Sequence, residues 1–352
     1  MNNMGARQSN HDPISPWFVA AEDSGEYIGI RFGRIDPDHS EPEWIFLRHA
    51  DYDGIGGFAH ILRNKGAAID TLPGQTHPAK PSRFDVLRLA PIYLQSRRQP
   101  KWNSRVIRPQ IKGAARHQAP TAVAWHVFSE IETSQIIATS KRHGVSVNSL
   151  LVNTLTRGIR PFLEDSSATV PWMIPVNLRG KVHRDRDTAN FTSCVGVKVK
   201  AGEITRETHR NIFAALDRKE HWANWQAYEL GKFTSHGMRK FLVATGLAIS
   251  QLSLGSFSNL GVWDAAKKIT VDACRGNWLF SPPVLRCQPI GAGCITFQNQ
   301  LSLTIQAHPE LTTQASVCQA WIQSWVQQIK LDLDTESKGL SKRSENSHPV
   351  KI

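Results

Sequence analysis

The alternation of hydrophobic and polar residues divides the first part of the chain into short elements. Alternation, short apolar runs and the breaker residues between them predict strands over residues 17–21, 27–35 and 43–49. A glycine-rich start followed by apolar residues on one face predicts a helix over residues 54–64. Residues 66–120 are rich in Pro, Gly, Gln and Arg and have little periodicity. We interpret them as a crossover linker with a short helix near residues 84–97.

The periodic signals become stronger from residue 121 onward. Helices are predicted over residues 132–143, 146–163 and 312–330, with two or three more between residues 204 and 250. Strands are predicted over residues 121–128, 171–179, 193–200, 252–263, 268–276, 293–300 and 301–309. Because the strands come in runs separated by groups of helices, the order predicts an α+β fold.

These elements predict four parts of the chain. We expect an N-terminal lobe at residues 1–65, the linker at 66–120, a C-terminal lobe at 121–333 and a tail at 334–352. The tail is rich in Ser, Lys and Glu, so we expect it to be disordered.

Composition excludes several classes of protein. Hydrophobic residues make up 40% and charged residues 20% of the 352 positions, which excludes a wholly disordered chain. No apolar run reaches about 18 residues, so we expect no membrane-spanning helix. The N-terminus lacks the apolar core of a signal peptide. The five cysteines include no C-x-x-C pair, so we expect reduced thiols in a cytoplasmic protein and no metal site.

The formal net charge of +12 is suited to a partner that carries negative charge. Coenzyme A, an acidic carrier protein or peripheral contact with an anionic membrane surface would each fit. Nucleic acid would also fit the charge, but the sequence has no zinc-finger, RNP1 or basic-zipper pattern, so this partner is disfavoured.

The segment RHADYDGIGG, residues 48–57, joins a predicted strand to a predicted helix. His49 at the strand end suits a general base, since neutral imidazole titrates near working pH. Asp53 would hold the loop by pairing with an arginine, and Gly54 lets the chain turn sharply beside a ligand. Two interpretations stay open from the spacing alone: a catalytic loop, or a core-edge histidine followed by an aspartate that only caps the helix.

The motif His49-x-x-x-Asp53-Gly54 resembles the active-site motif of the chloramphenicol acetyltransferase-like acyltransferases. This superfamily includes nonribosomal peptide condensation domains and wax ester synthase/diacylglycerol acyltransferases. Other segments agree with it in order and approximate distance over residues 43–330. They are GVSVNSLLVNTLTRGI (144–159), PWMIPVNLRG (171–180), NFTSCVGV (190–197) and SFSNLGVW (256–263).

The resemblance implies two related α/β lobes with a channel between them. It implies transfer of an acyl group from acyl-CoA or an acyl carrier protein to the hydroxyl or amine of a small-molecule acceptor, with no metal or further cofactor. By the same resemblance His49 is the general base, and Asp53 is structural and pairs with Arg179. Candidates for oxyanion contact or loop structure are Ser256, Ser258 and Asn259.

Two features depart from the family pattern. Many members carry two histidines before the spacer, whereas this chain has Arg48 at the first of those positions. Only 48 residues precede His49, so we expect a shortened first lobe. This lobe is trimmed, completed by another subunit in a homo-oligomer, or truncated in this sequence. The alternative is a non-catalytic relative that acts as a binding or scaffold module.

Overall fold

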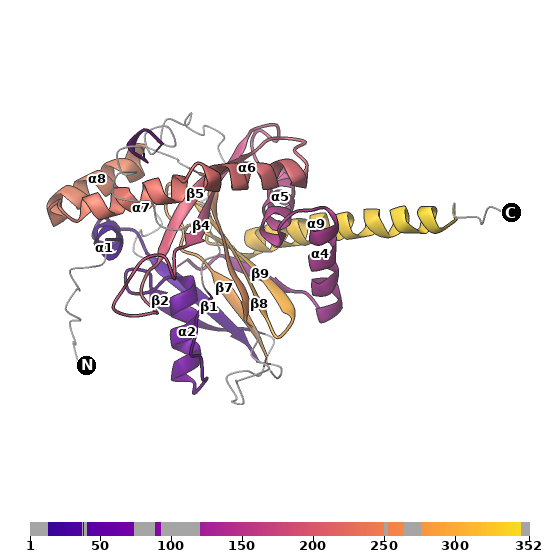
Figure 1. Cartoon of the computed structure of the whole chain (residues 1–352), viewed down its shortest axis with the longest axis horizontal. Coiled ribbons are helices and arrows are strands. Elements are labelled where there is room, and N and C mark those ends of the chain that lie inside the picture. The colour runs from indigo at the N-terminus through magenta and orange to yellow at the C-terminus, as the bar shows by residue number, and fades with distance from the viewer. Residues whose placement is uncertain are drawn as a thin grey trace.

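Two β-sheets with helices packed around them form the body of the protein (Figure 1). The computed structural model describes residues 13–36, 38, 41–73, 89–92, 120–249, 253–263 and 276–345. The smaller sheet has the strand order β2 (Glu43–Arg48), β1 (Gly29–Ile35), β7 (Asn277–Ser281). The larger has the order β3 (Val123–Val127), β9 (Gln300–Ala307), β8 (Ile290–Phe297), β6 (Gly255–Trp263), β4 (Val170–Asn177), β5 (Thr192–Val199). The smaller sheet is antiparallel and the larger one is mixed, and together with the grouped helices they confirm the α+β prediction.

The larger sheet contains the main hydrophobic core. In β9, Leu301, Leu303 and Ile305 share one face by alternation and are all buried. A tight hairpin joins β8 to β9, with left-handed φ angles of 48° at Gln298 and 62° at Asn299. The helices that share this core are α4 (Glu130–Arg142), α5 (Val147–Ile159), α6 (Thr205–Asp217), α7 (Glu220–Gly231) and α9 (Ala315–Glu345).

The smaller sheet joins segments that lie far apart in the sequence. Strand β1 pairs with β2 on one side and with β7, about 250 residues later, on the other. Helix α2 (Gly54–Asn64) covers this sheet, where Phe32, Phe58 and Trp278 form a second core. Strand β7 therefore completes the sheet of the N-terminal part, and the expected boundary at residue 120 does not separate the two sheets.

Strand β7 also ties the two sheets together. The Ser302 hydroxyl of β9 donates a hydrogen bond to the Trp278 carbonyl at 2.6 Å, and the Thr304 hydroxyl donates to the Phe280 carbonyl. These cross-links hold β7 against the β8–β9 hairpin and fix one wall of the space between the sheets.

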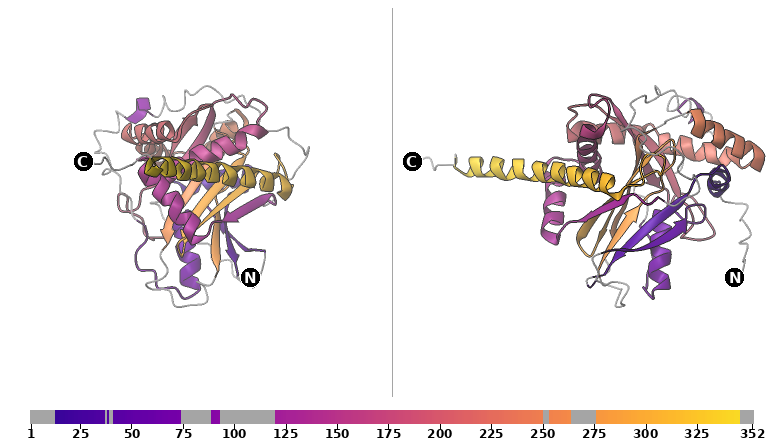
Figure 2. Two further views of the ribbon diagram at one scale, coloured as in Figure 1. Left: turned by 90° about the vertical axis from the view of Figure 1, so that its right-hand side faces the viewer. Right: turned by 180° about the vertical axis from the view of Figure 1, so that it is seen from behind.

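Three sequence predictions differ from the structure. Residues 17–21 lie in helix α1 (Ser15–Glu22) and not in a strand, because a short apolar run does not distinguish the two and Pro16 favours a helix start. Helix α9 continues to Glu345, so residues 334–345 of the expected disordered tail are helical, in agreement with their Lys, Glu and Leu content. Figure 2 shows this end of α9 projecting from the body. Strand β7 was not predicted.

Other predictions fall on positions outside the described residues. They are most of the linker (74–88 and 93–119), the strand over 268–275 and the tail end at 346–352. Within the described residues, no helix has the length and apolarity needed to cross a bilayer. No disulfide joins any two of the four cysteines described, and the described residues contain no cluster that could hold a metal ion.

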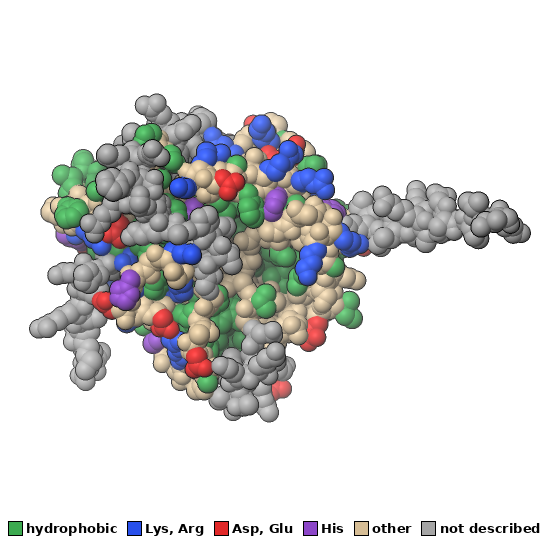
Figure 3. Space-filling view, in the orientation of Figure 1, with side chains coloured by type: hydrophobic (Ala, Val, Ile, Leu, Met, Phe, Trp, Pro, Cys, Tyr) green, Lys and Arg blue, Asp and Glu red, His purple; other side chains and the backbone are tan. Residues whose placement is uncertain are grey.

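The outer surface carries many charges. Figure 3 shows Lys, Arg, Asp and Glu side chains over the visible face, with hydrophobic side chains emerging at the end formed by α8 (His236–Ile249). Phe233 and Phe241 at that end are 88% and 64% exposed.

Candidate functional site

A cavity of about 530 Å³, which we call the central cavity, is lined by residues from both sheets. Phe18 of α1 and Phe280 of β7 line it, together with residues of β4, β5 and β6. The sequence-predicted residues found in its lining are His49, Gly54, Ser256, Ser258 and Asn259. Asp53 and Arg179 lie behind this lining, both buried. The structure thus brings all seven predicted site residues to one place.

The main chain of His49 is fixed from two sides. Its N–H donates to the Ile28 carbonyl at 3.1 Å, which extends the pairing of β1 and β2. Its carbonyl accepts a hydrogen bond from the Asn190 side chain at 3.2 Å. These contacts place the histidine at the end of β2, where the chain leaves the sheet beside the cavity.

The imidazole of His49 is held in one tautomer. Its Nδ1 lies 2.7 Å from the Tyr52 carbonyl oxygen. Because a carbonyl oxygen only accepts hydrogen bonds, Nδ1 carries the hydrogen and Nε2 keeps its lone pair. The ring of Phe18 stacks on the imidazole at a centroid distance of 4.2 Å. Nε2 of His49 can therefore act as a proton acceptor.

Burial lowers the pKa of His49 below the usual histidine value, although the hydrogen bond to the Tyr52 carbonyl and the charge of Asp53 act in the opposite direction. A lowered pKa keeps the ring neutral at pH 7. The site therefore has a base in its active protonation state without an additional group to remove its proton.

The carboxylate of Asp53 joins three parts of the chain. It caps α2 by accepting from the Gly56 N–H at 2.7 Å and also accepts from the Phe191 N–H at 2.8 Å. Arg179 Nη1 and Nη2 each donate to a different oxygen of it at 2.8 Å. Asp53 therefore caps the helix and also pairs with Arg179, so it does more than cap the helix.

Arg179 connects this carboxylate to the loop between β4 and β5. It donates to the Asp187 carbonyl at 3.1 Å and to the Ala189 carbonyl at 3.0 Å. Gly56 approaches the same loop so closely that an added Cβ would lie 2.1 Å from the Thr188 oxygen. The glycine is therefore required for the motif loop to reach its arginine.

Gly54 has a similar role on the cavity side. A Cβ at this position would lie 2.6 Å from Leu260 Cδ2 and 3.0 Å from Phe280 Cζ. The absence of a side chain lets the start of α2 pack directly against β6 and β7.

Ser256 and Ser258 lie two positions apart on β6, so they share a face. Ser256 Oγ is buried and has no hydrogen-bond partner among the described residues. Asn259 differs, since its side chain donates to Asn148 Oδ1 at 2.5 Å and accepts from the Gly261 N–H at 2.7 Å. Of the three candidates, Ser256 therefore has an unused hydroxyl at the cavity, and Asn259 holds the loop.

Sequence reasoning missed Asn190, Phe18 and Tyr52. Asn190 lies in a segment that resembles the family, but no spacing singled it out from its neighbours. Phe18 fell in a segment predicted as a strand. Tyr52 contributes only its main-chain carbonyl, which no side-chain pattern reveals.

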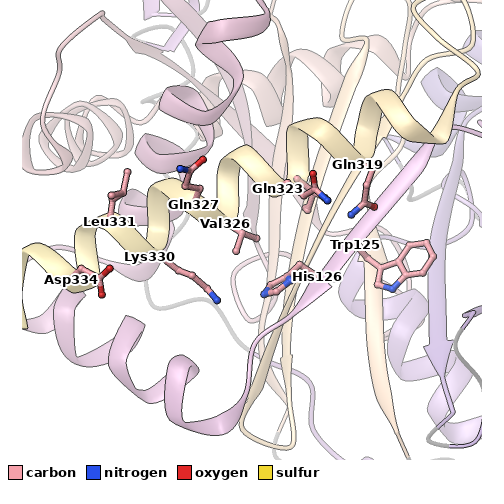
Figure 4. A pocket seen from close by; sticks show the side chains of 10 residues that line it. Trp125, His126, Gln319, Gln323, Val326, Gln327, Lys330, Leu331 and Asp334 are labelled. Carbon is pink, nitrogen blue, oxygen red and sulfur yellow. The ribbon is translucent and has the colours of Figure 1, made fainter.

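A second cavity, of about 390 Å³, lies between β3 and α9 and contains none of the predicted site residues (Figure 4). His126 lines it, and burial together with the charge of Lys330 lowers the pKa of this histidine. His126 has no hydrogen bond to Nε2 among the described residues. The predicted site residues therefore line or adjoin the central cavity and not this second one.

Comparisons with known proteins find similar solved structures, whereas no family model and no curated protein matches the sequence. One is the epimerization domain from the third module of tyrocidine synthetase B, with TM-score 0.54 and 12% identity over 83% of this chain and 69% of that one. A second is the trichothecene 15-O-acetyltransferase TRI3 from Fusarium sporotrichioides, with TM-score 0.57 and 15% identity over 86% and 70%. A third is the EpoB cyclization-docking bidomain from Sorangium cellulosum, with TM-score 0.54 and 10% identity over 82% and 59%.

At these identities the similarity is one of fold. The chain spans between 59% and 70% of the three structures it matches. They include domains of peptide synthetases and an acetyltransferase, as the resemblance of the motif implied. The protein therefore has the chloramphenicol acetyltransferase-like fold of condensation domains and related acyltransferases.

Proposed function

We propose that the protein transfers an acyl group from a thioester, either acyl-CoA or an acyl carrier protein, to a small-molecule acceptor, with His49 as general base. The observation that carries this proposal is the neutral, oriented imidazole in the wall of the central cavity. The similarity of fold to an acetyltransferase supports the reaction class, and the orientation of the imidazole supports its role as the base.

The proton balance of the reaction follows from the tautomer of His49. Nε2 accepts the proton of the acceptor as its heteroatom attacks the thioester carbonyl. The tetrahedral intermediate then collapses, the carbon–sulfur bond breaks, and the imidazolium returns the proton to the thiolate. A positioned base of this kind contributes on the order of 10²–10⁴-fold in rate.

The developing oxyanion requires a hydrogen-bond donor. Ser256 is our candidate, because its buried hydroxyl has no partner among the described residues and the residue lines the cavity. Ser256→Ala is expected to lower kcat by a factor on the order of 10²–10³. Asp53 and Arg179 are positioning residues in this scheme, since neither lines the cavity.

The test is thiol release from a panel of acyl-CoA and acyl carrier protein donors, with pooled acceptors. Wild type, His49→Ala and His126→Ala are compared. His126 is the matched control, because it also lines a cavity and also has a pKa lowered by burial. Acceptor-dependent release should disappear in His49→Ala and persist in His126→Ala. Equal release from all three would exclude His49 as the base.

The alternative of a non-catalytic binding or scaffold module makes the opposite prediction. No donor in the panel would then release thiol above the buffer rate, while the protein remains folded by circular dichroism. The homo-oligomer expected from the sequence stays a prediction, which light scattering would test.

A further inference from the structure

The part of the central cavity wall that the described residues form carries no ionic side chain. None of the described residues that line it is Asp, Glu, Lys or Arg. The outer surface, in contrast, is rich in charged side chains, as Figure 3 shows. The whole chain has 72 Asp, Glu, Lys and Arg residues and a net charge of +12. The carboxylate of Asp53 lies behind the wall, where Arg179 donates a hydrogen bond to each of its two oxygens.

The polar atoms of the wall divide into used and unused groups. Two asparagine amides are used: Asn224 Nδ2 donates to the Cys194 carbonyl at 2.9 Å, and Asn177 Nδ2 donates to the Pro73 carbonyl at 2.8 Å. The hydroxyls of Ser253 and Ser256 are unused, because both are buried and have no hydrogen-bond partner among the described residues. A buried polar group without a partner is costly, so these two hydroxyls indicate a ligand that supplies one.

Most of the other residues that line the cavity are apolar, although Thr192 and Ser193 add two hydroxyls that already donate hydrogen bonds, to Asp53 Oδ2 and to the His221 carbonyl. Phe18, Met173, Pro175, Leu260 and Phe280 contribute carbon surface from four different elements. A volume of about 530 Å³ is within the range of cavities that enclose a small organic molecule.

We propose that the acceptor bound here is an uncharged, mainly apolar alcohol, and that the cavity rejects acceptors that carry an ammonium group. This inference rests on the proposed function and narrows its acceptor from hydroxyl or amine to hydroxyl. An ammonium would lose its hydration in a wall that offers no carboxylate, and it has no lone pair with which to attack the thioester. An alcohol needs only a neutral proton acceptor and hydroxyl partners, which His49, Ser253 and Ser256 provide.

Binding to the wild-type protein tests the inference without turnover. The probes are phenylhexanol, phenylhexylamine and para-hexylaniline, titrated by calorimetry at pH 7. The two amines are isomers, but only phenylhexylamine is protonated at this pH. The alcohol and the aniline should bind, and phenylhexylamine should bind more weakly by a factor on the order of 100. Phenylhexylamine binding as tightly as the alcohol would overturn the inference, as would an absence of binding by both uncharged probes.

A designed carboxylate gives the reciprocal test. Met173 is partly exposed, lines the cavity and lies beside Ser256 in the β4–β6 register. Met173→Asp should raise the affinity for phenylhexylamine by a factor on the order of 10, whereas the isosteric Met173→Asn should not. If Met173→Asp does not fold, the comparison of the three probes on the wild-type protein still tests the inference. Equal gains in both variants would contradict a role of charge.

The two proposals fail in different ways. Selective binding of uncharged probes without any thiol release would remove the proposed transfer reaction and keep the ligand class. Thiol release that depends on alkylamines and not on alcohols would keep the transfer reaction and remove the ligand class.

Discussion

Two ion pairs of the same chemistry differ in burial at the scale of single residues. Asp53 and Arg179 are 1% and 7% exposed, whereas Asp187 and Arg63 are 53% and 30% exposed. Arg179→Ala leaves a buried carboxylate without its cation, so we expect the free energy of unfolding to fall by about 3–5 kcal/mol. Arg63→Ala is the control, with an expected loss of about 0–1 kcal/mol. Urea unfolding measures both, and equal losses would contradict a structural role specific to Asp53.

The protonation of His49 gives a second prediction for a single residue. Only the neutral ring accepts a proton, so activity should fall as pH decreases through its pKa. Because burial lowers that pKa, the midpoint of the acid limb of kcat/KM should lie below 6.5, the ordinary histidine value. Phe18→Ala removes the ring stacked on His49 and admits water, so it should move the midpoint upward. A wild-type midpoint at or above 6.5 would be inconsistent with a base desolvated in this way.

The site residues that belong to a recognisable motif could be predicted from the sequence. The residues that hydrogen-bond to them from distant parts of the chain could not. The motif resemblance selected His49 and Asp53, and the central strand resemblance selected Arg179. Asn190 reaches His49 from 141 positions away, and local spacing does not encode that contact. The unpartnered state of Ser256 likewise depends on what surrounds it in three dimensions.

Glycines at two helix starts give a matched prediction at the scale of elements. In α2, Gly56→Ala would push a methyl group against the Thr188 carbonyl at 2.1 Å and Arg179 Nη2 at 2.9 Å, so we expect lost activity and a lower melting temperature. In α8, a Cβ at Gly237 meets nothing within 4 Å. Gly237→Ala should therefore be neutral or stabilise by up to about 1 kcal/mol, because alanine favours helix. Differential scanning fluorimetry and the thiol assay compare them. An active, stable Gly56→Ala would contradict the close packing.

Elements were predicted well where their periodicity is local and less well elsewhere. The amphipathic α5 and the hairpin strands β8 and β9 lie within a few residues of the predicted ranges. Helix α1 was mistaken for a strand because five apolar residues contain too little pattern to distinguish the two. Strand β7 was missed, and its pairing with β1 spans about 250 residues and has no local signal. The two sheets meet through this strand, so the position of the cavity could not be deduced from periodicity.

The whole molecule should respond to acid in two separate steps. Burial lowers the pKa of His49, His60, His126 and His209, so between those values and 6.5 the unfolded chain binds more protons than the native protein. The free energy of unfolding therefore falls as pH decreases below 6.5. Carboxylates act later: hydrogen bonds from Ser129 and Lys330 lower the pKa of Glu132 to about 2, so its contribution is lost only below 4.5.

The acid response can be measured without a substrate. We expect the urea midpoint to decrease already between pH 7 and pH 5, before any carboxylate with a lowered pKa is protonated. His126→Gln removes one of the buried imidazoles and should flatten this first step, because the glutamine amide does not titrate. A midpoint that stays constant to pH 5 would mean that the native protein accepts protons on these histidines as readily as the unfolded chain. Water would then reach these histidines in the native protein, and desolvation would no longer explain a neutral His49 at the central cavity.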